Sequence, residues 1–220
     1  MKYKAIIFDM DGLLIDSERI ALSMFVQACR ECDFEPDIEV YYRCIGTTPP
    51  QTKEIFRDGY GPDFPFEAIS ELWDKKYQEE TLNKSVPLKE GALQLLKYLD
   101  GEGVKKAVAT STHQERARRK LANAKILHFF DFILSGDQIL QGKPNPEIYL
   151  ATCQRLGEEP AECLALEDSD NGVTAAFEAG LTVIQVPDLV EPSVRVQALG
   201  HKTVKSLRDV GPMLGFNLDP

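Results

Sequence analysis

The stretch AIIFDMDGLLIDS, residues 5–17, carries a short apolar run directly into two aspartates. Residues 5–8 are too apolar for an exposed edge and too few for a helix, so they predict a central strand of a parallel sheet covered on both faces. Alternate residues of a strand project to the same side, and we expect Asp9 and Asp11 to lie together at its carboxyl end. Ligands of open α/β sheets bind at that end.

The composition limits the possible partners. The chain has 220 residues, 43% of them hydrophobic, which is enough for a buried core. Acidic residues outnumber Lys and Arg by 35 to 25, and no basic cluster could follow a nucleic-acid backbone. The first apolar run is interrupted too early for a signal peptide or membrane span, and the five cysteines form no metal or secretory pattern. We expect a cytoplasmic monomer that acts on a small molecule, without nucleic-acid or membrane partners.

Further short apolar runs alternate with segments of helical spacing. The runs are 104–109, 132–134, 163–166 and 182–186, and the helical segments are 89–99, 113–123, 146–156, 171–179 and 206–214. This alternation predicts an α/β fold with a doubly wound parallel sheet. Between 16 and 85 no apolar strand appears and amphipathic segments dominate, such as 19–31 and 67–80. We therefore expect a core of residues 1–15 and 86–220 with a helical domain, 16–85, inserted above the site as a lid.

Polar side chains also lie at or after the ends of three other predicted strands. Thr110 and Ser111 end the second strand, ahead of Thr112-x-x-Glu115, which matches a capping box at a helix start, and free N–H groups there favour a phosphate. Lys143 lies in the stiff loop GKPNPE, and Glu167 and Asp168 end a later strand. Taken singly, these residues could be a helix cap, a solvated lysine and acids that favour a helix N-terminus.

Together these residues place an acid pair, a hydroxyl pair, a lysine and a second acid pair near one sheet edge. Asp9, Asp168 and a phosphate would repel one another, at about 4 kcal/mol per pair for ~4 Å and an effective dielectric constant of ~20. A divalent cation and Lys143 would offset that repulsion. Mg²⁺ is the expected cofactor because it prefers carboxylate and phosphate oxygens.

The set Asp9-x-Asp11-Gly12, Thr110, Lys143 and Glu167-Asp168 resembles the four motifs of the haloacid dehalogenase (HAD) superfamily. The helical insertion is similar to its C1-type caps, and the branch around β-phosphoglucomutase is the most similar. The resemblance implies that Asp9 is the nucleophile, forming an aspartyl-phosphate, and that Asp11 is the general acid and base. It further implies that Thr110, the Ser111 amide and Lys143 bind the phosphoryl oxygens. Asp9, Asp168 and the Asp11 carbonyl would bind Mg²⁺, with Glu167 as a further ligand or a residue behind the ligands.

The resemblance also bears on the reaction. Dehalogenases of this superfamily keep no acid at the position of Asp11, so Asp11 favours phosphate esters. β-Phosphoglucomutases carry a histidine, a lysine and an arginine where this chain has Ala21, Ile45 and Pro49. Without those cations a bisphosphate intermediate is not held, which favours a phosphatase for small phosphorylated metabolites such as sugar monophosphates. A phosphosugar mutase remains the alternative, and a phosphate-binding or receiver-like module is the non-enzyme alternative.

The insertion should read the organic part of the substrate. Ile45, Gly46, Thr47 and Thr48 are the expected specificity loop. Trp73 and Tyr77 lie one helical turn apart, a spacing that favours packing inside the insertion over stacking on a sugar.

Overall fold

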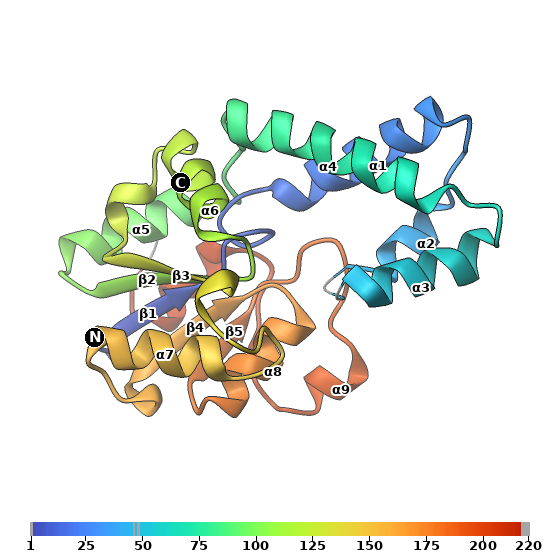
Figure 1. Ribbon diagram of the computed structural model, residues 1–220. Helices are drawn as coiled ribbons and strands as arrows, with labels where there is room; N and C mark the ends of the chain where they lie inside the picture. The colour runs from blue at the N-terminus through green and yellow to red at the C-terminus, as the bar shows by residue number, and fades with distance from the viewer. Residues whose placement is uncertain (1, 46, 48, 217–220) are drawn as a thin grey trace. The chain divides into compact units, whose positions relative to one another are not determined.

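The computed structural model describes residues 2–45, 47 and 49–216. Its main feature is a six-stranded parallel sheet in the order β3-β2-β1-β4-β5-β6 (Figure 1). The strands are β1 (Ala5–Phe8), β2 (Lys105–Thr110), β3 (Phe132–Ser135), β4 (Cys163–Glu167), β5 (Thr182–Gln185) and β6 (Lys202–Thr203). This topology confirms the predicted doubly wound α/β fold class.

Strand β1 lies at the centre of the sheet, and all four of its side chains are fully buried. It pairs with β2 on one side and β4 on the other, so that Ala5 lies opposite Lys105 and Cys163. Ligands bind in doubly wound sheets where the strand order reverses, beside the carboxyl ends. The loops after β1, β2 and β4 therefore emerge side by side at that place.

Helices cover both faces of the sheet. The face of Ile7 and Ala165 packs against α7 and α8, through Tyr149 and Val173, while α5 and α6 lie on the other side (Figure 1). The core helices are α5 (Ala92–Gly101), α6 (Gln114–Asn123), α7 (Glu147–Leu156), α8 (Asp170–Glu178), α9 (Val194–Gln197) and α10 (Val210–Met213). Short 3₁₀ turns are η1 (Leu127–Phe129), η2 (Gly136–Gln138), η3 (Pro160–Glu162) and η4 (Leu207–Asp209).

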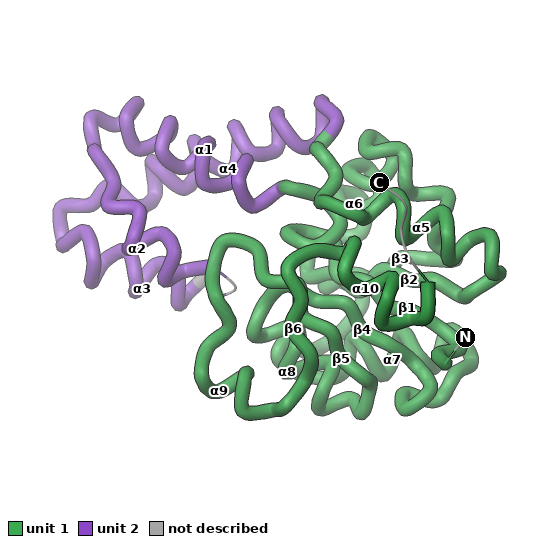
Figure 2. The backbone as a smooth tube through the Cα atoms, turned by 180° about the vertical axis from the view of Figure 1, so that it is seen from behind, with its two compact units in different colours: residues 1–16, 86–220 green, residues 17–85 purple. Residues whose placement is uncertain are grey.

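The chain divides into two compact units, residues 1–16 with 86–220 and residues 17–85 (Figure 2). The second, the cap unit, contains α1 (Ser17–Glu31), α2 (Ile38–Tyr42), α3 (Pro49–Tyr60) and α4 (Phe66–Asn83). It has its own core, in which the Phe25 ring contacts those of Tyr41, Phe56 and Trp73 at centroid distances of 5.0, 5.0 and 5.2 Å. Asp16, which we expected in the insertion, groups with the first unit because its N–H donates to the Pro87 carbonyl at 2.8 Å.

At the end of the chain the structure differs from the sequence-based expectation in two elements. The sixth strand, β6, was not predicted because its two residues are polar and exposed and form no apolar run. The helix predicted over 206–214 is instead a 3₁₀ turn, η4, followed by the four-residue α10. The capping box of Ser206 and Asp209 turns the chain there, with the Asp209 carboxylate accepting from the Ser206 N–H at 3.0 Å.

Phe25→Ala should destabilise the cap unit by about 3–5 kcal/mol, because the removed ring leaves a cavity among aromatic neighbours. Trp73, the single tryptophan of the sequence, lies in this cluster, so its fluorescence during urea unfolding reports on the cap unit. Phe177→Ala, at an exposed ring of α8, is the matched control. A fluorescence midpoint equal to that of the control would contradict a cap held together by this cluster.

Candidate active site

Asp9 follows β1 and is buried, with 7% of its surface exposed. Its N–H continues the sheet by donating to the Leu166 carbonyl at 3.0 Å, and its Oδ1 accepts from Lys143 Nζ at 2.6 Å. Asp11 contacts a different partner, Lys120, whose Nζ lies 2.7 Å from Asp11 Oδ1. The two aspartates of the motif are therefore anchored separately, each by its own lysine.

Gly12 lets a second carboxylate approach this loop. Its φ of +83° is a left-handed conformation that side chains disfavour. A Cβ at this position would also lie 2.4 Å from Asp168 Oδ2, closer than any real contact. The glycine of the DMDG motif is therefore required by its own backbone and by the position of Asp168.

Lys143 is the cation at the centre of the cluster, and only 5% of its side chain is exposed. Besides Asp9, its Nζ donates to Glu167 Oε1 at 2.5 Å and to the Ala109 carbonyl at 3.0 Å. Its loop is fixed by Glu147, whose carboxylate accepts from the N–H groups of residues 140 and 141, each at 2.8 Å. Lys143 thus joins the ends of β1, β2 and β4.

Glu167 is fully buried, and both of its oxygens are engaged. Oε1 accepts from Lys143 and, at 2.6 Å, from the Tyr149 hydroxyl. Oε2 accepts from the Asp168 N–H at 3.1 Å and from the Ser169 hydroxyl at 3.2 Å. Gly172 lies against this carboxylate, since a Cβ there would be 1.9 Å from Glu167 Cδ. These contacts suit a residue that places Lys143 and the β4 loop.

Burial and the proximity of these groups shift their pKa values. Burial raises the pKa of Asp9 to about 7, with Lys143 acting to lower it and Glu167 to raise it. Burial alone would lower the pKa of Lys143, but the Asp9 and Glu167 carboxylates raise it well above its ordinary value. Burial, with Glu167 beside it, also raises the pKa of Tyr149 well above its usual range. The two carboxylates beside Lys143 therefore favour its charged form.

Three carboxylates could hold a metal ion. Asp9, Glu167 and Asp168 each offer an oxygen, and these oxygens lie within 4.8 Å of one another. Hard carboxylate oxygens in this number suit Mg²⁺, which keeps several waters and takes one or two protein carboxylates. Because Glu167 already accepts several hydrogen bonds, Asp9 and Asp168 fit this ion best.

The loop after β2 brings hydroxyl groups to the same edge. Thr110 is buried and its Oγ1 accepts from the Thr112 N–H at 3.1 Å, while Ser111 is exposed. The predicted capping box at Thr112 and Glu115 was wrong. The helix begins with His113 as N-cap and no side-chain cap bond, and the Gln114 N–H donates instead to Asp137 Oδ1 at 2.9 Å.

The hydroxyl of Thr112 has a different partner. It donates to Asp11 Oδ2 at 2.7 Å, so Thr112 and Lys120 contact the two oxygens of the same carboxylate. Sequence reasoning did not identify Lys120, because the helix QERARRKLAN looks like a solvated basic face. It also did not identify Glu147, although this residue ends the GKPNPE motif.

The cap unit contains a cavity of about 900 Å³. Ile45 and Thr47 of the expected specificity loop line it, and Gly46 and Thr48 lie outside the described residues. The remaining lining residues are Glu18, Ala21, Tyr41, Cys44, Pro50, Thr52, Lys53, Phe66, Ser70, Trp73, Asp74 and Tyr77. Trp73 lines this cavity and also packs against Phe25 in the core of the cap unit. Its Nε1 donates to the Ala21 carbonyl at 2.8 Å. Aromatic rings form part of the cavity lining, and the lysine that lines it, Lys53, is paired with Glu67 at 2.6 Å.

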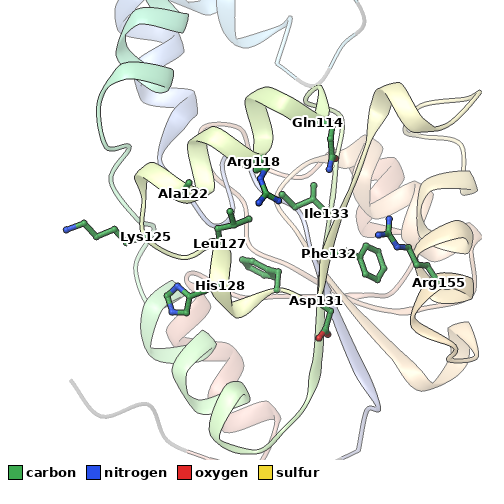
Figure 3. A pocket seen from close by; sticks show the side chains of 11 residues that line it. Gln114, Arg118, Ala122, Lys125, Leu127, His128, Asp131, Phe132, Ile133 and Arg155 are labelled. Atoms are coloured by element: carbon green, nitrogen blue, oxygen red, sulfur yellow. The ribbon is translucent and has the colours of Figure 1, made fainter.

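A second cavity, of about 580 Å³, lies beside the edge strand β3 (Figure 3). Arg118 of α6 and Arg155 of α7 line it, with the Arg155 guanidinium 4.1 Å from the centre of the Phe132 ring. None of the predicted site residues that the structure describes lines this cavity.

Comparisons with known proteins match most of the chain, the insertion included. A model of the haloacid dehalogenase-like hydrolases matches residues 6–186. A phosphorylated carbohydrates phosphatase of Thermotoga maritima is 30% identical over 180 residues, covering 81% of this chain and 82% of that protein. Protein CbbY of Rhodobacter capsulatus is 31% identical over 196 residues, covering 85% and 86% of the two chains.

A solved structure of an Asp-to-Asn variant of CbbY from Rhodobacter sphaeroides, in complex with xylulose-(1,5)bisphosphate, is also similar. It is 26% identical, with a TM-score of 0.76, and the match covers 98% of this chain and all of the other. Among the described residues of our chain, no helix combines the length and apolarity needed to cross a bilayer.

The free energy of unfolding of Asp9→Asn should increase relative to that of the unmodified chain as the pH rises from about 4 to about 7 in metal-free buffer. The pKa of Asp9 rises on folding from 3.8 to about 7. Between these values the native state keeps a proton that the unfolded state has lost, so the unmodified chain loses up to about 1.4 kcal/mol per pH unit. Urea unfolding at several pH values measures the difference between the two chains.

The exposed Asp63, replaced by asparagine, controls for the loss of one carboxyl group. A difference between Asp9→Asn and the unmodified chain that shrinks as the pH rises would mean that Lys143 keeps Asp9 ionised and stabilising.

Proposed function

The chain belongs to the haloacid dehalogenase-like hydrolase family, and we propose that it is a Mg²⁺-dependent phosphatase of small phosphorylated metabolites, with sugar monophosphates as the expected substrates. The observation that carries this proposal is the Asp9 carboxylate, buried at the end of β1 and 2.6 Å from the Lys143 ammonium. A cation in this place can stabilise both the nucleophile and a phosphoryl oxygen beside it. The similarity to a carbohydrate phosphatase and to a bisphosphate-bound protein supports a phosphorylated substrate.

The reaction would proceed in two steps. A carboxylate oxygen of Asp9 attacks phosphorus, the bond from phosphorus to the ester oxygen breaks, and Asp11 gives its proton to the leaving oxygen. Water then attacks the aspartyl-phosphate and gives a proton to Asp11. The bond from phosphorus to Asp9 breaks, so that phosphate leaves and both carboxyl groups return to their initial state.

The phosphoryl group would be bound by the ends of two other loops. The Thr110 hydroxyl, the Ser111 N–H and the Lys143 ammonium would donate to its oxygens. The Asp9 and Asp168 carboxylates and the Asp11 carbonyl would hold Mg²⁺, which when bound offsets the negative charge of the phosphate. Glu167 would act behind these residues by orienting Lys143.

The cap unit would recognise the organic part of the substrate. We place this role on Ile45, Gly46, Thr47 and Thr48, of which Ile45 and Thr47 line the cavity of the cap unit. A phosphosugar mutase is the second candidate, because Lys53 in the same cavity offers a cation for a second phosphate. Its pairing with Glu67 and the presence of Ala21 and Ile45 nearby favour the phosphatase.

Phosphate release from a panel of sugar and nucleoside monophosphates, with and without Mg²⁺, tests the proposal. We expect release that depends on Mg²⁺ and falls by about a thousandfold or more in Asp9→Asn, since the nucleophile is lost. Asp63→Asn, at an exposed carboxylate, should retain full activity.

Two other results would contradict the phosphatase. Conversion of β-glucose 1-phosphate to glucose 6-phosphate with little free phosphate, in the presence of a bisphosphate activator, would establish the mutase. No turnover of any ester, together with phosphate binding, would indicate a phosphate-binding or receiver-like module.

A further inference from the structure

We propose that Lys120 is a positioning residue which, with Thr112, fixes the Asp11 carboxylate in its working orientation. This inference rests on the proposed function, in which Asp11 exchanges protons with the leaving oxygen and with water. Lys120 would act only through Asp11 and would not touch the substrate.

The geometry defines both the place and the rotation of the carboxyl group. Lys120 Nζ donates to Asp11 Oδ1 at 2.7 Å, and Thr112 Oγ1 donates to Oδ2 at 2.7 Å. A single contact would leave the group free to turn about its last bond, whereas contacts to both oxygens hold its plane. General acid–base catalysis requires such placement, because a proton is transferred only within hydrogen-bond reach.

Lys120 is buried, unlike the arginines of its helix. Arg116, Arg118 and Arg119 are exposed, whereas only 3% of the Lys120 side chain is. Ala117 and Leu121 already supply buried apolar contacts from the same helix. Burying an ammonium group costs free energy, and a buried ion pair is often no more stabilising than an apolar residue in its place. A role in stability therefore does not explain a lysine here, whereas holding the Asp11 carboxylate does.

The same loop links this carboxylate to the phosphate site. The Thr112 N–H donates to the Thr110 hydroxyl at 3.1 Å, while the Thr112 hydroxyl holds Asp11. The group that delivers the proton and a group proposed to bind the phosphoryl oxygens are thus placed by one short segment. Lys120 completes this arrangement from the following helix, as Lys143 does for Asp9 from another loop.

Lys120→Met tests the inference, with Arg119→Met as the matched control at an exposed neighbour. We expect kcat on the best alkyl phosphate of the panel to fall about 100-fold with KM changed less than about threefold, because orientation of the proton donor is lost. Lys120→Arg should restore part of the rate. Arg119→Met should behave like the unmodified chain.

p-Nitrophenyl phosphate separates the two steps. Its leaving group departs without a proton, so formation of the aspartyl-phosphate should keep its rate in Lys120→Met while attack by water slows. We therefore expect a burst of one nitrophenolate per chain before a slow steady state. A merely structural role would lower the rates on both substrates equally, without a burst.

Thr112→Val removes the other contact to Asp11 and should show the same burst, which keeps the test valid if Lys120→Met folds poorly. Unchanged kcat in both variants, or an equal loss on both substrates without a burst, would overturn the inference. Failure of the proposed function would look different, since then the unmodified chain itself would release no phosphate from any ester.

Discussion

Repulsion among the carboxylates at the ends of β1 and β4 is the constraint on which the site depends. Oxygens of Asp9, Glu167 and Asp168 lie within 4.8 Å of one another, where each like-charge pair costs about 4 kcal/mol at an effective dielectric constant of ~20. Lys143 offsets this cost because its ammonium contacts Asp9 and Glu167 at once. The fold therefore supplies a buried lysine, held by a separate loop, to balance the charge of these acids.

The crowding of these carboxylates also explains two glycines of the site. A Cβ on Gly12 would lie 2.4 Å from Asp168 Oδ2, and one on Gly172 would lie 1.9 Å from Glu167 Cδ. At each glycine, a carboxylate of the cluster occupies the space that a Cβ would fill. Glu167 and Asp168, at the end of β4, thus lie against the backbone of two different segments, one before and one after them in the chain.

The sequence alone predicted the core of this site but not its supports. Asp9 and Lys143 follow strands, and the carboxyl ends of parallel strands meet at one edge, so their proximity follows from the βα pattern. The capping box failed because the Thr112 hydroxyl found a stronger acceptor, Asp11, 101 residues away in the chain. Lys120 looks solvated among its basic neighbours, and only the packing of its helix shows that it is buried. Local spacing contains no information on such long-range contacts.

The insertion is attached to the loop that carries Asp9 and Asp11. Ile15 forms a bridge with Leu88, and the Asp16 N–H donates to the Pro87 carbonyl, so the segments that enter and leave the insertion are paired with each other. The Ile15 carbonyl also accepts from the Gly12 N–H at 3.0 Å, which ties this pair to the turn that follows Asp9. Every contact that we describe at the site comes from residues 1–16 and 86–220, while the cavity of the cap unit is lined by residues of 17–85. Because the paired segments fix the turn, the lining residues of the cavity can change without disturbing the carboxylates. If the proposed function is correct, the reaction and the choice of substrate can then vary independently.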